Sequence, residues 1–241
     1  MEHQISILTG AGQQLTVEKF KEMGFTFNDA AGVILQTPII GMVISLDCFE
    51  EQWGEAGKLI TKEKGDSQNL MDLSGLELTK QIVDFQQKSG FEGMSAAKRC
   101  WGYHRKTNAG TDCLQWYLPC AYELCTICAF KEEIKAAMIS IGVDDEGMLL
   151  FEDWFWSSSE GSSNFAVGVY FDSGYLNNSY KYNNYYVRAV SAFKPLSGFN
   201  SLPCELHEQG TFDSSLASDD DLVKELKKRG FVGEVTKKYT L

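Results

Sequence analysis

One stretch of the sequence, residues 155–193, constrains the fold more than any other part. It reads FWSSSEGSSNFAVGVYFDSGYLNNSYKYNNYYVRAVSAF, which is apolar at both ends and rich in Asn, Tyr, Ser and Gly in the middle. Apolar residues recur between Ala166 and Phe171, and the turn-forming residues 172–174 follow. We therefore predict short strands joined by tight turns, with a middle that does not belong to a core.

The middle of this stretch combines rigid aromatic residues with small polar ones. Tyr offers a large amphipathic contact area at low entropic cost, and Ser, Gly and Asn supply adaptable hydrogen bonds, which is the composition of an antibody paratope. The alternative interpretation is an Asn-rich, low-complexity loop. The apolar, well-punctuated flanks favour a binding surface.

The two ends of the stretch, FWSSSE and YVRAVSAF, resemble the frame of the C-terminal variable region of diversity-generating retroelement proteins. In that family a reverse transcriptase copies a template with adenine-specific errors, which convert Asn codons to codons for Tyr, Ser, Gly, Phe, Asp or His. Gly161 is a further candidate position, and Asp172 is ambiguous. The resemblance implies a set of diversified, ligand-binding positions: Phe165, Gly168, Tyr170, Ser173, Tyr175, Asn177, Asn178, Ser179, Tyr180, Tyr182, Asn183, Asn184 and Tyr185.

The same resemblance implies an α+β chain with the C-type lectin-like fold of the formylglycine-generating-enzyme type. That fold has short twisted antiparallel strands and two main helices. Two upstream features also resemble the family: a strand pair leading to Trp53-Gly54, and Leu118-Pro119 before Glu123-Leu124 at the start of a helix. The resemblance therefore reaches beyond the variable stretch.

Three regions are expected along the chain. Residues 1–28 form an N-terminal segment, 29–193 the lectin-like domain, and 194–241 a linker with a helix–strand tail. The tail departs from the family pattern, in which many chains end soon after the variable region, and it is a candidate docking site for an assembly partner. Periodicity and capping residues predict strands at 33–35 and 39–46, helices at 15–23, 75–88, 95–103, 121–141 and 219–229, and a last strand at 231–239.

The formal charge of −11, from 22 basic and 33 acidic residues, argues against nonspecific binding to nucleic acid or anionic membranes. No apolar run is long enough to cross a bilayer, so direct membrane insertion is not expected. The N-terminus has no secretory signal pattern. We expect cytoplasmic synthesis, with association with a phage particle as one later location.

Seven cysteines are expected to be reduced thiols packed as small apolar residues. The spacing Cys120, Cys125, Cys128 matches the start of a plant-type iron–sulfur site, but these residues lie in a predicted helix and core packing is the preferred interpretation. The acidic loop 144–147 lacks the ligand spacing of a calcium site. His104 is expected at the surface. No cofactor is therefore expected.

The leading functional prediction is a non-enzymatic protein that recognises a protein or glycan on a cell or phage surface. The anchors would be Tyr170, Tyr175, Tyr180, Tyr182 and Tyr185, with Asn177, Asn178, Asn183 and Asn184 as adjustable hydrogen-bonding groups, above a frame of Trp156, Ser157, Ser158, Val187 and Arg188.

Two alternatives remain on the same fold. A formylglycine-generating-enzyme-like oxidase would need cysteines that the region 161–188 does not contain. A calcium-dependent lectin would need clustered acidic and amide ligands such as a Glu-Pro-Asn triplet, which is absent from the sequence, whereas glycan binding without metal stays open.

Overall fold

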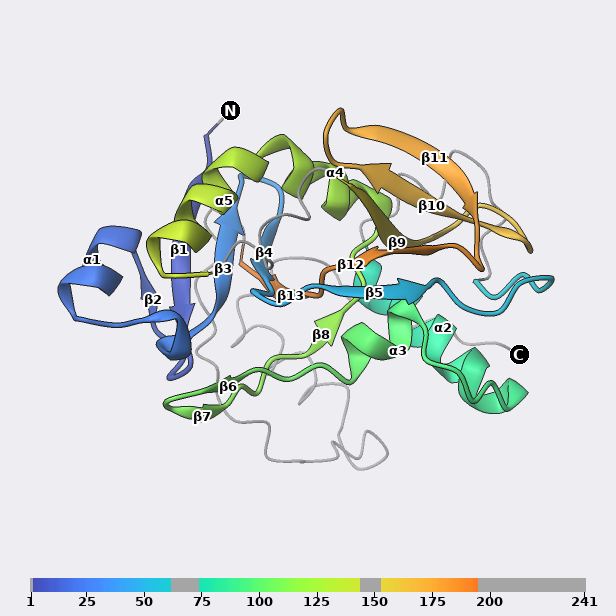
Figure 1. Ribbon diagram of the computed structural model, residues 1–241, viewed down its shortest axis with the longest axis horizontal. Helices are drawn as coiled ribbons and strands as arrows, with labels where there is room; N and C mark the ends of the chain where they lie inside the picture. The colour runs from blue at the N-terminus through green and yellow to red at the C-terminus, as the bar shows by residue number, and fades with distance from the viewer. Residues whose placement is uncertain (1, 62–73, 144–152, 195–241) are drawn as a thin grey trace, which may run out of the picture. The chain divides into compact units, whose positions relative to one another are not determined.

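A computed structural model describes residues 2–61, 74–143 and 153–194 (Figure 1). The chain divides into two compact units, Met1–Ser201 and Leu202–Leu241, and the described residues all belong to the first. The tail expected to form a helix and a strand at 219–239, and the acidic loop at 144–147, lie outside the described residues.

A six-stranded antiparallel sheet forms one half of this unit, in the order β2-β1-β3-β4-β13-β8. All seven residues of its strand β3, AAGVILQ, are buried, as expected for a β-branched run between two packed layers. The strands are β1 Gln4–Thr9, β2 Gln14–Leu15, β3 Ala30–Gln36, β4 Gly41–Ile44, β8 Trp116–Tyr117 and β13 Val190–Phe193.

The N-terminal strand β1 belongs to this sheet, because it pairs along its whole length with β3. The expected boundary at residue 28 therefore falls inside one folded unit. Residues before it supply β2 at the edge of the sheet and β1 beside it, and they form no separate segment. The sequence alone did not reveal this, since pairing between distant strands leaves no local signal.

A five-stranded sheet forms the other half, in the order β11-β10-β9-β12-β5. Its pairs are antiparallel except for β9 with β12, which is parallel. The strands predicted within residues 155–193 are thus confirmed, and they span most of this sheet. The strands of this sheet are β5 Phe49–Gln52, β9 Trp154–Glu160, β10 Phe165–Tyr170, β11 Tyr175–Tyr180 and β12 Asn184–Val187. A separate two-stranded hairpin pairs β6 Lys106–Thr107 with β7 Gly110–Thr111.

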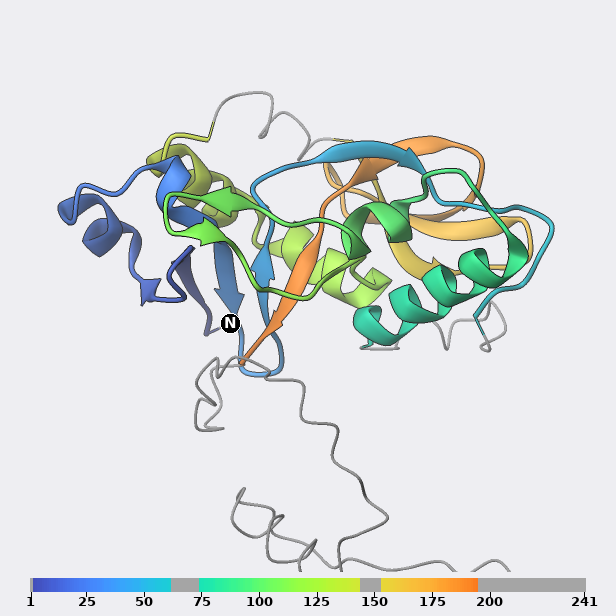
Figure 2. The ribbon, with the colours of Figure 1, turned by 90° about the horizontal axis from the view of Figure 1, so that it is seen from below.

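Few helices accompany the sheets, so the chain is a β-rich α+β fold. Those at 75–88 and 95–103 are confirmed; α2 lies against β9, and α3 lies against β5 and β8 (Figure 2). No helix in the described ranges is long and apolar enough to span a membrane. The helices are α1 Val17–Glu22, η1 Phe27–Asp29, α2 Gly75–Ser89, α3 Ala96–Trp101, α4 Ala121–Ala129 and α5 Lys131–Ser140.

The helix predicted over residues 121–141 is two helices, which corrects the prediction. Phe130 ends α4 and begins α5, and its amide bonds to Ile127 O at 3.1 Å, three residues back. This tight turn re-aims the chain, so that α4 packs on β9 and β10 while α5 packs on β1 and β3. One straight helix could not cover both sheets.

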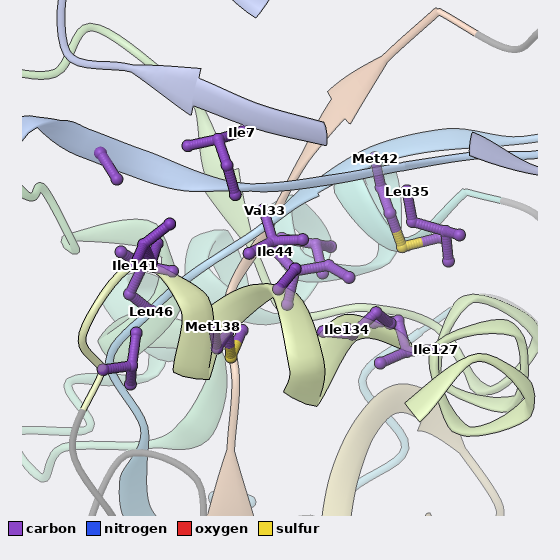
Figure 3. Packing of buried hydrophobic residues seen from close by; sticks show 14 of the residues in the cluster. Ile7, Val33, Leu35, Met42, Ile44, Leu46, Ile127, Ile134, Met138 and Ile141 are labelled. Carbon is purple, nitrogen blue, oxygen red and sulfur yellow. The ribbon is translucent and has the colours of Figure 1, made fainter. Parts of the chain in front are cut away.

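The core beneath α5 joins helix and sheet side chains. Ile134 and Met138 meet Ile7, Val33 and Ile44 from β1, β3 and β4 (Figure 3). A second buried cluster, on the other side of the six-stranded sheet, contains Trp53, Trp116 and Trp156 together with the apolar faces of α2 and α3. The two clusters hold both sheets as one scaffold beneath the β10–β11 hairpin.

Candidate ligand-binding surface

The residues predicted to form the frame are all buried. Trp156 on β9 donates its indole N–H to Glu51 O at 3.2 Å and to Asn183 O at 3.3 Å, which ties β9 to β5 and to the loop before β12. Ser157 donates to Val167 O at 2.8 Å and so fixes β9 against β10. The indole and the hydroxyl thus lock the strands that carry the predicted binding residues.

Arg188 completes the frame from the end of β12. Its guanidinium is buried and donates to Ser45 O at 2.8 Å and to Leu46 O at 3.4 Å. This contact fixes the end of the five-stranded sheet to the chain that follows β4 of the six-stranded sheet. The burial expected of the frame is confirmed, and the side chains of Trp156, Ser157 and Arg188 are hydrogen-bonded.

A buried ion pair, which the sequence analysis did not find, fixes the loop between β11 and β12. Lys181 and Glu160 are fully buried and their charged groups are in contact. The carboxylate also accepts hydrogen bonds from Ile60 N at 3.0 Å, Thr61 N at 2.8 Å and Thr61 Oγ1 at 2.8 Å. Because each charge is paired and hydrogen-bonded, the pair is tolerated without solvent.

The ammonium group of Lys181 has two further partners. It donates to Lys58 O at 2.9 Å and lies 4.6 Å from the centre of the Trp53 ring, within cation–π range. Burial lowers the pKa of Lys181, and the hydrogen bond and charge of Glu160 oppose that shift. The sequence signal for this buried ion pair is a single lysine, Lys181, within a long uncharged tract.

The backbone of Lys181 is held as firmly as its side chain. Its N–H donates to Asn164 O at 3.1 Å, and its carbonyl accepts from Trp53 N at 3.0 Å. The neighbouring Tyr180 and Tyr182 are 45% and 55% exposed, and their rings stack with centres 5.0 Å apart. Tyr180 and Tyr182 therefore expose their rings on either side of Lys181, whose backbone is fixed.

A second aromatic group lies around Trp154 at the start of β9. The centre of its ring is 5.3 Å from that of Tyr170, 6.2 Å from Tyr175 and 5.6 Å from Tyr185. Tyr185 is oriented by its hydroxyl, which donates to Ser179 Oγ at 2.9 Å. Tyr175 is 60% exposed, so this aromatic shelf opens to solvent at its outer end.

The predicted binding residues are brought together in space, but they differ in exposure. Seven are exposed: Ser173, Tyr175, Asn177, Asn178, Tyr180, Tyr182 and Asn184. Four are half-buried: Phe165, Tyr170, Asn183 and Tyr185. The remaining two, Gly168 and Ser179, are buried and are not available for contact with a partner.

Gly168 is buried because aromatic rings cover it. A Cβ at this position would come within 3.2 Å of both the Trp154 and the Tyr185 rings, closer than ordinary van der Waals contact. The glycine therefore makes room for the aromatic shelf. Gly168 contributes to the surface by letting the Trp154 and Tyr185 rings pack closely over β10.

The exposed residues occupy both faces of the β10–β11 hairpin. The register pairs Tyr170 with Tyr175, and Phe165 with Tyr180. Because side chains alternate between the faces of a strand, Tyr175 and Asn177 lie on the Trp154 face and Tyr180 on the opposite one. The predicted surface thus wraps around the hairpin and its outer edge, β11 (Figure 1).

Other candidate groups lie apart from this surface. Glu123 has the structural role expected of it, since it accepts from Cys120 N at 2.8 Å and from Tyr117 Oη at 2.8 Å at the start of α4. Cys125 and Cys128 lie along α4, partly buried against the core. His104 is exposed, as predicted. Among the described residues no three His, Cys, Asp or Glu side chains are grouped to hold a metal ion.

Comparison with protein-family models and with curated protein sequences finds no match. Among solved structures, the chain is similar to a fimbrial protein from Bacteroides ovatus, with a TM-score of 0.54 and 12% sequence identity. The match covers 79% of this chain and 49% of the fimbrial protein, so the chain spans about half the length of that neighbour. At this identity the similarity concerns the fold alone.

Proposed function

We propose that the chain is a non-enzymatic, hypervariable ligand-binding protein with a C-type lectin-like fold, diversified by a retroelement and used for attachment to a cell or phage surface. The observation that carries the proposal is the separation between fixed and displayed residues. Trp156 and Lys181, which lie outside the retroelement codon set, are buried and hydrogen-bonded. The exposed Tyr180 and Tyr182 flank Lys181 in the sequence.

The chemistry of the exposed residues supports capture of another macromolecule. Tyr175, Tyr180 and Tyr182 present large rings that are already held by ring contacts, edge-on to Trp154 for Tyr175 and stacked for Tyr180 with Tyr182, so little side-chain entropy is lost when a partner covers them. Asn177 and Asn178 supply amide donors and acceptors beside them. The similarity in fold to a fimbrial protein is consistent with use of such a scaffold at a cell surface.

Binding is tested with the double variant Tyr175→Ala/Tyr180→Ala. Neither ring belongs to the two buried clusters, so we expect the melting temperature to stay within about 3 °C of the parent value, since exposed changes usually alter stability by less than about 0.5 kcal/mol. We expect at least a tenfold loss of affinity for ligands selected on the parent chain from arrays of glycans and surface proteins. The control is Ile139→Ala, which trims a residue 53% exposed on α5, away from the hairpin.

The retroelement origin has its own test in the neighbouring DNA. The proposal requires a reverse-transcriptase gene and a near-copy of the codons for residues 155–193 that differs only where the template has adenine. A locus without either, together with unchanged ligand capture by the double variant, would refute the proposal.

A further inference from the structure

Among the described residues, strand β11 is an open edge of the five-stranded sheet. The amide of Lys181, just beyond β11, donates to Asn164 O on the β10 side. Because successive backbone groups point to opposite sides of a strand, those of Tyr175, Asn177 and Ser179 point to β10. The amide and carbonyl groups of Leu176 and Asn178 therefore point outward, away from the sheet.

This edge lacks the features that normally protect a sheet edge. Its sequence, YLNNSY, contains no charge and no proline, and its pairing with β10 runs over six residues without a bulge. The opposite edge, β5, carries the acidic residues Glu50 and Glu51. The edges of the six-stranded sheet, β2 and β8, are two residues long. Among the edges of the two main described sheets, β11 alone is long, free of bulges and uncharged.

We propose that β11 binds an extended peptide segment of the ligand, which adds to the sheet as a further strand. This inference rests on the proposed function and specifies the partner as a polypeptide recognised in part through its backbone. Side chains of the added strand would alternate between two environments. On one face they would meet Tyr175 and Asn177, and on the other Leu176 and Tyr180.

The strand added at β11 comes from a partner of different charge and not from a second copy of this chain. Each copy carries a net charge of −11, and like charge opposes self-association. The edge itself is uncharged, so it accepts a neutral strand core, while basic residues flanking that core would be attracted to the acidic protein. An uncharged, β-branched or aromatic segment between basic residues fits these conditions.

The test separates backbone recognition from side-chain recognition at one position. Ten-residue peptides are selected on the intact chain from a random displayed library, and their affinities are measured for Asn178→Pro and Asn178→Ala. Proline removes the outward N–H and is tolerated in an edge strand, whereas alanine keeps the N–H and removes only the amide side chain. Because the alanine variant reports the loss of the amide side chain alone, we expect the affinity of the proline variant to lie at least tenfold below that of the alanine variant.

A second measurement uses the parent chain, so it does not depend on the folding of a variant. Each amide of a selected peptide is methylated in turn, and strand addition predicts that methylation at every second residue abolishes binding while methylation of the intervening amides leaves it unchanged. Absence of this two-residue period would overturn the proposal.

Two other outcomes would also overturn strand addition. One is a dimer of the parent chain that Asn178→Pro converts to a monomer, which would assign the edge to a second copy. The other is selection of glycans and no peptides, with loss of binding in Tyr175→Ala/Tyr180→Ala and none in Asn178→Pro, which would leave the proposed function standing. If neither Tyr175→Ala/Tyr180→Ala nor Asn178→Pro changes the affinity for any captured ligand, the proposed function is overturned as well.

Discussion

Replacement of Lys181 by Met removes one partner of the buried ion pair while keeping most of the side-chain volume. The change deletes the contact with Glu160, the hydrogen bond to Lys58 O and the cation–π contact with Trp53. Removal of one member of a buried pair costs about 3–5 kcal/mol, because the other charge stays buried and uncompensated. Glu160 keeps its hydrogen bonds from residues 60 and 61, so we expect the lower end, about 3 kcal/mol.

For a folded unit of this size, about 3 kcal/mol corresponds to a fall in melting temperature of about 6–12 °C. The assay is urea unfolding followed by tryptophan fluorescence, with thermal unfolding by circular dichroism beside it. Lys58→Met is the matched control, because it makes the same substitution in a surface pair with Glu55, where Lys58 is 52% exposed. Surface pairs contribute about 0–1 kcal/mol, so the control should lose no more than that.

A Lys181→Met loss below about 1 kcal/mol, equal to that of the control, would refute the argument that this pair anchors the loop. The double variant Glu160→Gln/Lys181→Met adds a second criterion. Because it leaves no uncompensated charge, its loss should be smaller than the sum of the two single losses. Simple additivity of the losses would show that the two groups do not act as a pair.

Two further predictions concern packing and pH. Gly168→Val forces a branched side chain against two aromatic rings at 3.2 Å and should lower the free energy of unfolding by about 1–3 kcal/mol in urea titrations; an unchanged value would contradict the tight packing. Burial, together with the adjacent Glu123 carboxylate, raises the pKa of Tyr117 well above its usual value of 10.0, so its hydroxyl ionises first in the unfolded chain and stability falls as the pH rises above 10.0. Tyr117→Phe should lose about 1 kcal/mol at pH 7 but show a slope above pH 10 that is smaller by about 1.4 kcal/mol per pH unit, and an equal slope would contradict it.

Local sequence signals predicted most of the elements near the site. The alternation and turn residues of 165–180 indicated the β10–β11 hairpin. Gly174 has the positive φ of 73° that the turn requires. The helix over 75–88 was clear from its spacing, and Gly90 ends it one residue later than predicted. Such predictions succeed because the determinants lie within one element.

Features set by distant contacts could not be predicted in this way. The N-terminal strand joined the main sheet, and Phe130 divided a helix, for reasons that lie in the shape of the packed sheets. Arg105 follows the exposed His104 in the sequence, yet it is buried and donates to Ala30 O at 2.9 Å. A buried cation has the same sequence signature as an exposed one, because its partners come from far along the chain.

At two positions of the binding surface, the residues that the codons allow differ from the residues that the packing allows. The codon set admits Phe or Tyr at Gly168 and Ser179, but both positions are buried, and Ser179 holds the Tyr185 hydroxyl at 2.9 Å. A large side chain at either position would displace the aromatic shelf, so these positions tolerate a smaller range of residues than their codons allow. Under the proposed function, variation that preserves the scaffold is therefore concentrated on the exposed residues of β11 and of the loop around Lys181, where added bulk meets solvent.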